Sequence, residues 1–169
     1  MGRQCKREVL AIGMQTPVFL HATHFIDAPV DRVWAILGDF AHSELGKGFV
    51  SKLVGDGNDI GAVRTLHIAE EFGGGTIVER QTARDESGCY YAYEILDYGS
   101  LPFDDYYGSA HAIPTGPRST AVIWTNRYTA PTEQAEEFRQ RSLAILNVIE
   151  GNMRQLTQEY LANDPPSKI

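Results

Sequence analysis

Glu79 and Arg64 are the residues of this chain whose types and positions first indicate chemistry. Residues 75–85 read GTIVERQTARD, a run typical of a β-strand, in which successive side chains point to opposite faces. The solvated residues occupy the even positions: Val78, Arg80, Thr82 and Arg84. Glu79 is therefore predicted to face the interior, with Ile77 and Gln81. An interior carboxylate can act as a general acid or base, or simply form an ion pair.

Arg64 is the predicted partner of Glu79. On the preceding strand Arg64, Leu66 and Ile68 share one face. If the intervening FGGGT loop pairs residue 70 with residue 75, Leu66 lies opposite Glu79, and Arg64 lies diagonal to it within reach of a long side chain. The sequence thus predicts a buried ion pair between Arg64 and Glu79.

A second candidate group for proton transfer is His111, near Tyr107 on a later strand. A histidine in this position could carry protons to a substrate carbonyl, although a hydrogen-bonded interior histidine is an equally good interpretation. The same alternation predicts further inward-facing, ligand-contacting residues on the later strands and the last helix. These are Tyr91, Tyr93, Ile95, Ser109, Val122, Trp124, Asn126, Tyr128, Val148 and Asn152.

This inventory of aromatic walls and a few polar groups is typical of a small-molecule site. Each aromatic residue could equally belong to an ordinary core, because aromatic side chains dominate cores generally. The polar residues favour a cavity, because unpaired polar groups and charges are costly to bury in a solid core. We therefore expect a hollow domain and not a filled one.

The sequence contains little that favours a metal site or a nucleotide site. His21 and His24 are three apart on a predicted strand, which sends them to opposite faces, so they cannot share a metal. The run GDGNDIG lacks the third glycine of a dinucleotide fingerprint and is flanked by strands on both sides. We expect neither a metal nor a cofactor.

Composition narrows the class further. The 169 residues fit one domain, and a net charge of −7 with scattered Lys and Arg argues against a nucleic-acid partner. No apolar run approaches the roughly 18 residues of a membrane span. The two cysteines show no framework spacing, which favours a reducing compartment, and a cytoplasmic monomer or homodimer is expected.

The order of elements predicts an α+β domain. A strand at 18–26 and a short helix at 28–37 precede six strands separated by turn residues, which at such short spacing must mostly be antiparallel. From Thr132 to about Ala162, apolar residues recur at three- and four-residue steps, which predicts one long helix. We expect a loose extension at 1–15, a ligand-binding domain at 16–163 and a flexible tail at 164–169.

This order, carried by HFIDAPVDRVWAILGDF, GAVRTL, IVERQTARD, YAYEI, LPFDDYYGS, TAVIWTNRYTAP and NMRQL, resembles the helix-grip (SRPBCC) superfamily over residues 18–160. That group includes birch pollen allergens, START-type lipid carriers, polyketide cyclases and dehydratases, and abscisic acid receptors. The resemblance implies a seven-stranded curved sheet wrapped around the C-terminal helix, with two short helices after the first strand. The enclosed cavity would take an apolar or aromatic molecule.

The resemblance is closest to the polyketide cyclase/dehydratase branch. It implies that Arg64 anchors a carbonyl or enolate while Tyr93 and Tyr107 donate hydrogen bonds. Similarity to the hormone receptors places Lys47 at a pocket lysine, but the EFGGG loop lacks the receptors' Ser-Gly-Leu-Pro gate, so hormone sensing is not implied.

Two functions are therefore predicted. One is a cofactor-free cyclase, dehydratase or isomerase acting on an aromatic or polyketide-like substrate by acid–base chemistry. The other is a carrier or sensor that holds a lipid or aromatic metabolite unchanged. Polar groups in the interior favour the enzyme, because a lipid carrier is expected to line its cavity almost wholly with apolar side chains.

Overall fold

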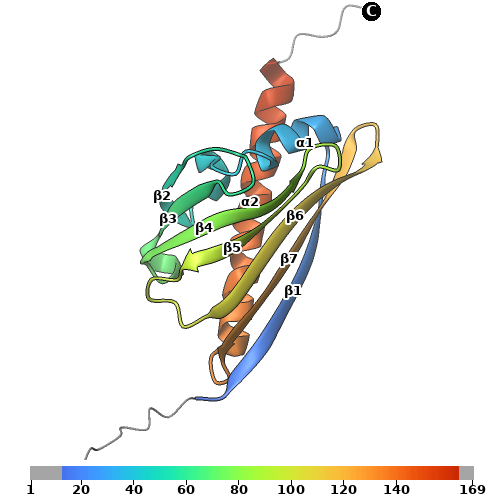
Figure 1. Cartoon of the computed structure of the whole chain (residues 1–169). Helices are drawn as coiled ribbons and strands as arrows, with labels where there is room; N and C mark the ends of the chain where they lie inside the picture. The colour runs from blue at the N-terminus through green and yellow to red at the C-terminus, as the bar shows by residue number, and fades with distance from the viewer. Residues whose placement is uncertain (1–12, 164–169) are drawn as a thin grey trace, which may run out of the picture.

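The computed structural model describes residues 13–163, which form one antiparallel sheet and a long helix (Figure 1). The expectations for residues 1–12 and 164–169 lie outside the described part. The strands are β1 (Gln15–Ile26), β2 (Val50–Gly55), β3 (Val63–Ile68), β4 (Thr76–Asp85), β5 (Tyr90–Asp97), β6 (Asp104–Gly116) and β7 (Ser119–Pro131). The helices are α1 (Val30–Leu37), the 3-10 turns η1 (Ser43–Gly46) and η2 (Glu70–Phe72), and α2 (Ala135–Asn163).

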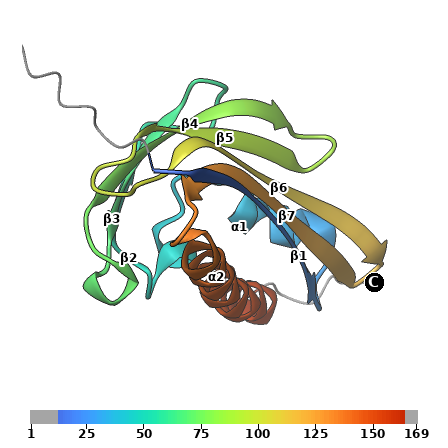
Figure 2. The ribbon, with the colours of Figure 1, turned by 90° about the horizontal axis from the view of Figure 1, so that it is seen from below.

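The sheet order is β1-β7-β6-β5-β4-β3-β2, so β1 and β2 are the two edge strands. After β2 the chain crosses the sheet strand by strand through hairpins until β7 pairs with β1. Figure 2 shows the sheet curving over α2, which lies on its concave side together with α1. This confirms the predicted α+β fold: a seven-stranded curved antiparallel sheet wrapped around a long C-terminal helix, with α1 and η1 after the first strand.

Register irregularities accompany the curvature. The β4–β5 pairing shifts between Val78 and Glu79 and again between Gln81 and Ala83. An extra residue in one strand bends it and re-aims the side chains that follow. Arg84 consequently lies with only 12% of its side chain exposed, and the prediction that it sits on the solvated face is wrong.

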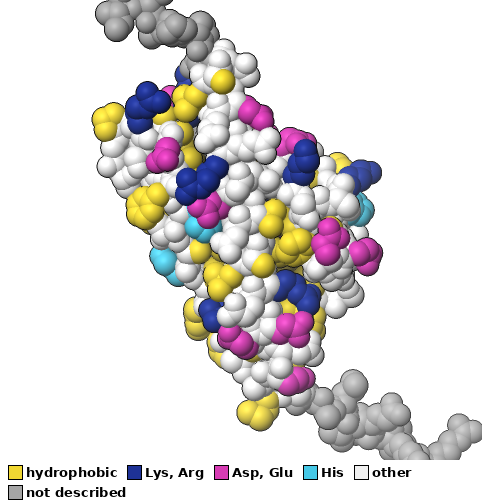
Figure 3. Space-filling view, turned by 180° about the vertical axis from the view of Figure 1, so that it is seen from behind, with side chains coloured by type: hydrophobic (Ala, Val, Ile, Leu, Met, Phe, Trp, Pro, Cys, Tyr) yellow, Lys and Arg dark blue, Asp and Glu magenta, His cyan; other side chains and the backbone are white. Residues whose placement is uncertain are grey.

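The buried residues gather between sheet and helix. The main cluster joins α1, the middle of β5 to β7 and the central turns of α2, with Val33, Leu37, Phe40, Tyr91, Val122 and Met153 among its members. None of the described helices has a segment apolar and long enough to cross a bilayer. On the face opposite to that of Figure 1, side chains of both charges are interspersed, without a patch of one sign (Figure 3).

Candidate ligand cavity

A cavity of about 140 Å³ lies between the concave face of the sheet and α2. Its wall is mostly apolar, with Phe49, Leu66, Ile77, Ile95 and Ile149 drawn from both layers. Phe72, Leu101 and Arg141, from η2, the β5–β6 loop and α2, line one end and are partly exposed. An apolar wall with a few convergent polar groups is the usual make-up of a small-molecule site.

The Arg64–Glu79 ion pair forms the polar centre of the cavity. Arg64 Nε donates to Glu79 Oε2 at 2.6 Å, and the two side chains are 14% and 6% exposed. Arg64 Nη1 also donates to the Phe40 carbonyl at 2.7 Å, and the guanidinium lies 4.1 Å from the centre of the Phe40 ring. The predicted pair is confirmed, and the charge of each group is matched by the other.

The register of this pair differs from the prediction. Arg64 is directly opposite Glu79, and Leu66 is opposite Ile77. The hairpin is longer than expected because the chain makes the η2 turn after Ala69, and Ile68 N–H donates to the Gly75 carbonyl. That larger turn moves the pairing by two residues, which keeps the same faces inward.

Burial governs the proton affinity of these groups. Burial alone lowers the pKa of Arg64, but the Glu79 carboxylate, aided by Tyr91 and Tyr93, raises it overall, so the guanidinium stays charged. Burial raises the pKa of Tyr93 and of Tyr106, and the negative charge of Glu79 adds to the effect. Both phenols therefore remain protonated hydrogen-bond donors at neutral pH.

A chain of hydrogen-bonding groups continues from Tyr93 across the sheet. The Tyr93 and Tyr106 hydroxyls are 3.5 Å apart, and Asn126 Nδ2 donates to the Tyr106 hydroxyl. Gly108 makes room for the Tyr93 ring: a Cβ there would lie 2.3 Å from Tyr93 Cζ. The absence of a side chain on β6 is thus what seats this phenol.

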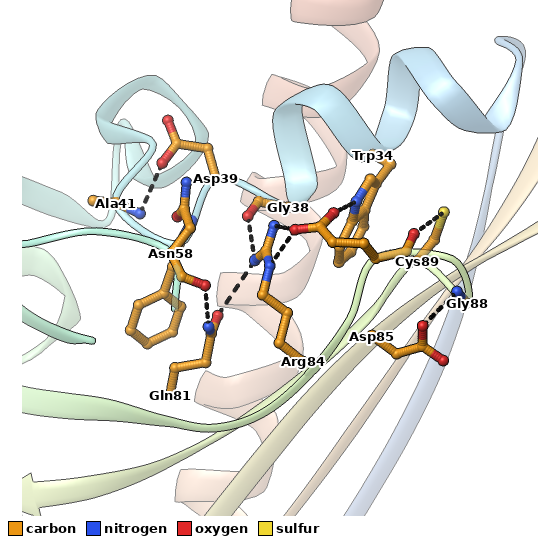
Figure 4. Close-up of polar contacts among 12 residues, drawn as sticks. Trp34, Gly38, Asp39, Ala41, Asn58, Gln81, Arg84, Asp85, Gly88 and Cys89 are labelled. Atoms are coloured by element: carbon orange, nitrogen blue, oxygen red, sulfur yellow. Dashed lines mark hydrogen bonds and ion pairs between the residues drawn. The ribbon is translucent and has the colours of Figure 1, made fainter. Parts of the chain in front are cut away.

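A second polar network joins β4 to the segment that follows α1 (Figure 4). Gln81 Nε2 donates to the Asn58 carbonyl, and Asn58 Oδ1 accepts from the Phe40 N–H at 2.7 Å. Arg84 Nη1 donates to the Gly38 carbonyl at 2.7 Å. The segment after α1 is therefore fixed to β4, and the Phe40 carbonyl that binds Arg64 is held in place.

Ten of the predicted residues line the cavity: Arg64, Leu66, Ile68, Ile77, Glu79, Tyr91, Tyr93, Ile95, Trp124 and Asn126. Three others lie inside the protein beside it. Gln81 is fully buried in the network just described, Val122 belongs to the solid core, and Tyr128 stacks on Tyr106 with its centroid at 5.7 Å.

The prediction that odd-numbered residues of β6 face inward is wrong. Tyr107 lies on the outer face, where its hydroxyl is 2.9 Å from that of Tyr90, and His111 packs edge-on against the Tyr90 ring. Ser109 is buried on the same outer side and does not line the cavity. The small residues Gly108, Ala110 and Ala112 face inward instead, because the β5 aromatic rings need that space.

Three predictions around η1 and α2 also fail. The Lys47 side chain is 75% exposed and pairs with Glu44. Asn152 Nδ2 donates to the Leu45 and Lys47 carbonyls, at 3.0 and 2.7 Å, so it anchors η1 to α2. Val148 packs with Phe49 and its neighbours outside the cavity lining. The resemblance placed Lys47 by a short alignment, and the local 3-10 turn directs its side chain into solvent.

Sequence reasoning missed several lining residues. Tyr106 could have been found from the small-residue alternation at 108, 110 and 112, which marks the inward face. Phe138, Ser142 and Ile145 lie on α2 at the three- and four-residue steps that predict this helix. Asp39 and His42 lie in the loop after α1, where no periodicity reports side-chain direction.

Comparison with known proteins identifies the family. The family model described as polyketide cyclase / dehydrase and lipid transport matches residues 19–165. The chain belongs to this family. Over 74 residues it is 28% identical to the abscisic acid receptor PYL6 of Arabidopsis thaliana, a match that covers 42% of this chain and 34% of the receptor. The chain thus aligns with about a third of that curated relative.

Solved structures share the fold. Norcoclaurine synthase from Thalictrum flavum superposes with a TM-score of 0.71 at 17% identity, covering 94% of this chain and 96% of that one. The Zhui aromatase/cyclase from a Streptomyces species gives a TM-score of 0.65 at 18% identity, covering 87% and 94%. At these identities the likeness concerns the helix-grip fold alone.

Proposed function

We propose that this family member binds an aromatic or otherwise hydrophobic small molecule and catalyses a cofactor-free cyclisation, dehydration or isomerisation of it. The observation that carries the proposal is the Arg64–Glu79 pair, buried at the wall of an apolar cavity beside phenol donors. Interior charges contribute little to stability compared with apolar replacements, so their presence at a cavity wall favours a chemical role.

The chemistry starts with enolisation of a bound ketone. Glu79 takes a proton from the carbon next to the carbonyl, while Arg64 and Tyr93 stabilise the negative charge that develops on the oxygen. The enolate carbon can then attack a second carbonyl, whose oxygen receives the proton from Glu79. Glu79 then removes a second proton from the attacking carbon and returns it to the hydroxyl group, which leaves as water while the carbon–carbon double bond forms, and this completes a dehydration.

Two further features support this function. The cavity volume is close to that of cavities that hold one benzene-sized ring, so a ring can lie inside while the rest of a larger substrate extends toward the partly exposed end. The family description includes cyclases and dehydrases, and a structural relative is an aromatase/cyclase.

Deuterium exchange into a simple aryl ketone tests the enolisation step. Acetophenone in D₂O is incubated with the protein, and loss of its methyl proton signal is followed by NMR. We expect exchange above the buffer rate with the wild-type chain and a loss of about 10²-fold or more of the catalysed rate in Glu79→Gln. The outer-face variant Tyr107→Phe is the matched control and should exchange at the wild-type rate.

A non-catalytic carrier or sensor is the second candidate. The mainly apolar wall and the partial match to a hormone receptor favour it. Acetophenone binding without exchange, in the wild type and in Glu79→Gln alike, would support the carrier and refute the enzyme.

A further inference from the structure

Trp124 presents a buried hydrogen-bond donor that the protein leaves unused. The residue is 3% exposed and lines the cavity, and its Nε1 has no hydrogen-bond partner among the described residues. The other tryptophan differs: Trp34 Nε1 donates to Glu86 Oε2 at 2.7 Å. Because the indole nitrogen can only donate, the missing partner must be an acceptor.

Unpartnered buried side-chain atoms concentrate at this cavity. Within residues 13–163 there are three of them: His24 Nδ1, His42 Nδ1 and Trp124 Nε1. Two of the three, on His42 and Trp124, belong to residues that line the cavity. Leaving a buried polar group unsatisfied is costly, and such exceptions call for a physical reason. A ligand whose polar atoms meet these two groups supplies one.

The charged side chains around the cavity restrict the charge of the part of the ligand that is buried there. Asp39 and Glu79 contribute two carboxylates to the lining, and Arg64 is already paired with Glu79. Arg141, at the partly exposed end, is paired with Glu137 at 2.8 Å. A buried anion would therefore find both lining arginines already paired and the Asp39 carboxylate nearby, whereas a neutral acceptor such as a carbonyl oxygen needs no counterion.

We propose that Trp124 is a specificity-determining residue that recognises an uncharged carbonyl oxygen on an aromatic ligand, through a hydrogen bond from its Nε1. His42 Nδ1 meets a second polar atom of the same ligand when one is present. This inference rests on the proposed function, since it requires that the cavity bind an aromatic molecule. It adds the chemical class of the ligand, a neutral aryl ketone or quinone-like compound whose buried part is about one ring in size.

A matched pair of probes tests the role of Trp124. Acetophenone and α-methylstyrene have nearly the same planar shape and differ by the exchange of C=O for C=CH₂. We expect the wild-type chain to bind acetophenone several-fold to about tenfold more tightly. In Trp124→Phe, which keeps an aromatic ring and removes the N–H, the affinity ratio should fall several-fold, and Arg64 and Tyr93 account for any preference that is left. Trp34→Phe, the control, should keep the wild-type ratio.

Indole N–H resonances give an independent reading on the unaltered chain, which decides the matter even if Trp124→Phe folds poorly. Trp34→Phe assigns the two signals. Acetophenone should move the Trp124 signal downfield, and α-methylstyrene should not. Equal affinity for the two probes, or a ratio preserved in Trp124→Phe, would overturn the role of Trp124 while ligand binding stands. Failure of both probes to bind would overturn the proposed function as well.

Discussion

Removing one partner of the Arg64–Glu79 pair should destabilise the protein more than removing both. The pair is 14% and 6% exposed, so a single replacement leaves a charge in the interior without its counterion. Such a loss costs about 3–5 kcal/mol, a large share of a typical total of about 5–15 kcal/mol. Glu79→Leu and Arg64→Met should each fall in this range, with Arg64→Met the worse because the Phe40 carbonyl also loses its donor.

The double variant Arg64→Met/Glu79→Leu should lie within about 1–3 kcal/mol of the wild type, because an apolar pair of similar volume needs no desolvation of charge and only the Phe40 carbonyl is left without its donor. Urea unfolding of the four chains gives the coupling free energy, which we expect to exceed about 2 kcal/mol.

The surface pair Arg80–Glu94 is the matched control, since it also involves β4 but is 47% and 36% exposed. The equivalent cycle there should give a coupling of about 0.2–1 kcal/mol. A single-variant cost below about 1 kcal/mol at Arg64 or Glu79, or equal couplings in the two cycles, would refute the reasoning that the cavity pair is desolvated.

Three further predictions follow from the same geometry. Gly108→Ala should lower the free energy of unfolding in urea by about 1–3 kcal/mol, because the new Cβ collides with the Tyr93 ring. Gly151→Ala, on the open surface of α2, should raise it by about 0.5–1 kcal/mol. Equal effects of the two substitutions would show that Tyr93 is free to move. Stability should fall as pH rises above about 10, because tyrosines in the unfolded chain lose their protons there, whereas Tyr93 and Tyr106 in the folded protein have raised pKa values and keep theirs. Thermal unfolding of Tyr93→Phe/Tyr106→Phe as a function of pH should show a shallower fall. An unchanged slope would contradict this. Lys47→Ala should leave the acetophenone affinity measured by calorimetry unchanged, since the Lys47 side chain lies in solvent. A tenfold loss of affinity would show that Lys47 contacts the ligand.

The sequence was informative where periodicity and chemistry agree. Alternation on β3, β4 and β5 placed Arg64, Glu79 and Tyr93 on the cavity wall, because each strand mixes large apolar with solvated residues. It failed on β6, where the inward residues after Tyr106 are the small Gly108, Ala110 and Ala112, and bulky polar residues such as Tyr107 lie on the outer face. The β5 aromatic rings occupy the space over this part of β6, so small side chains face the interior there and large ones face outward.

Loops and strand irregularities also limit what the sequence predicts about side-chain positions. The η2 turn changed the β3–β4 register, and the bulge before Ala83 turned Arg84 inward, neither of which alternation reports. Asp39 and His42 reach the cavity from the segment after α1, which is held by the Asn58 side chain through the Phe40 N–H. Such placement depends on contacts between distant parts of the chain, which a single sequence does not display.

The most direct test of the central claim, that the interior between sheet and α2 receives a ligand, is an intermolecular NOE measurement with bound acetophenone. We predict contacts from its ring protons to methyl groups on both layers, on Leu66 and Ile77 of the sheet and on Ile149 of α2. Contacts confined to the exposed methyl groups of Val54 and Ile60, or no contacts at all under saturating acetophenone, would contradict the account.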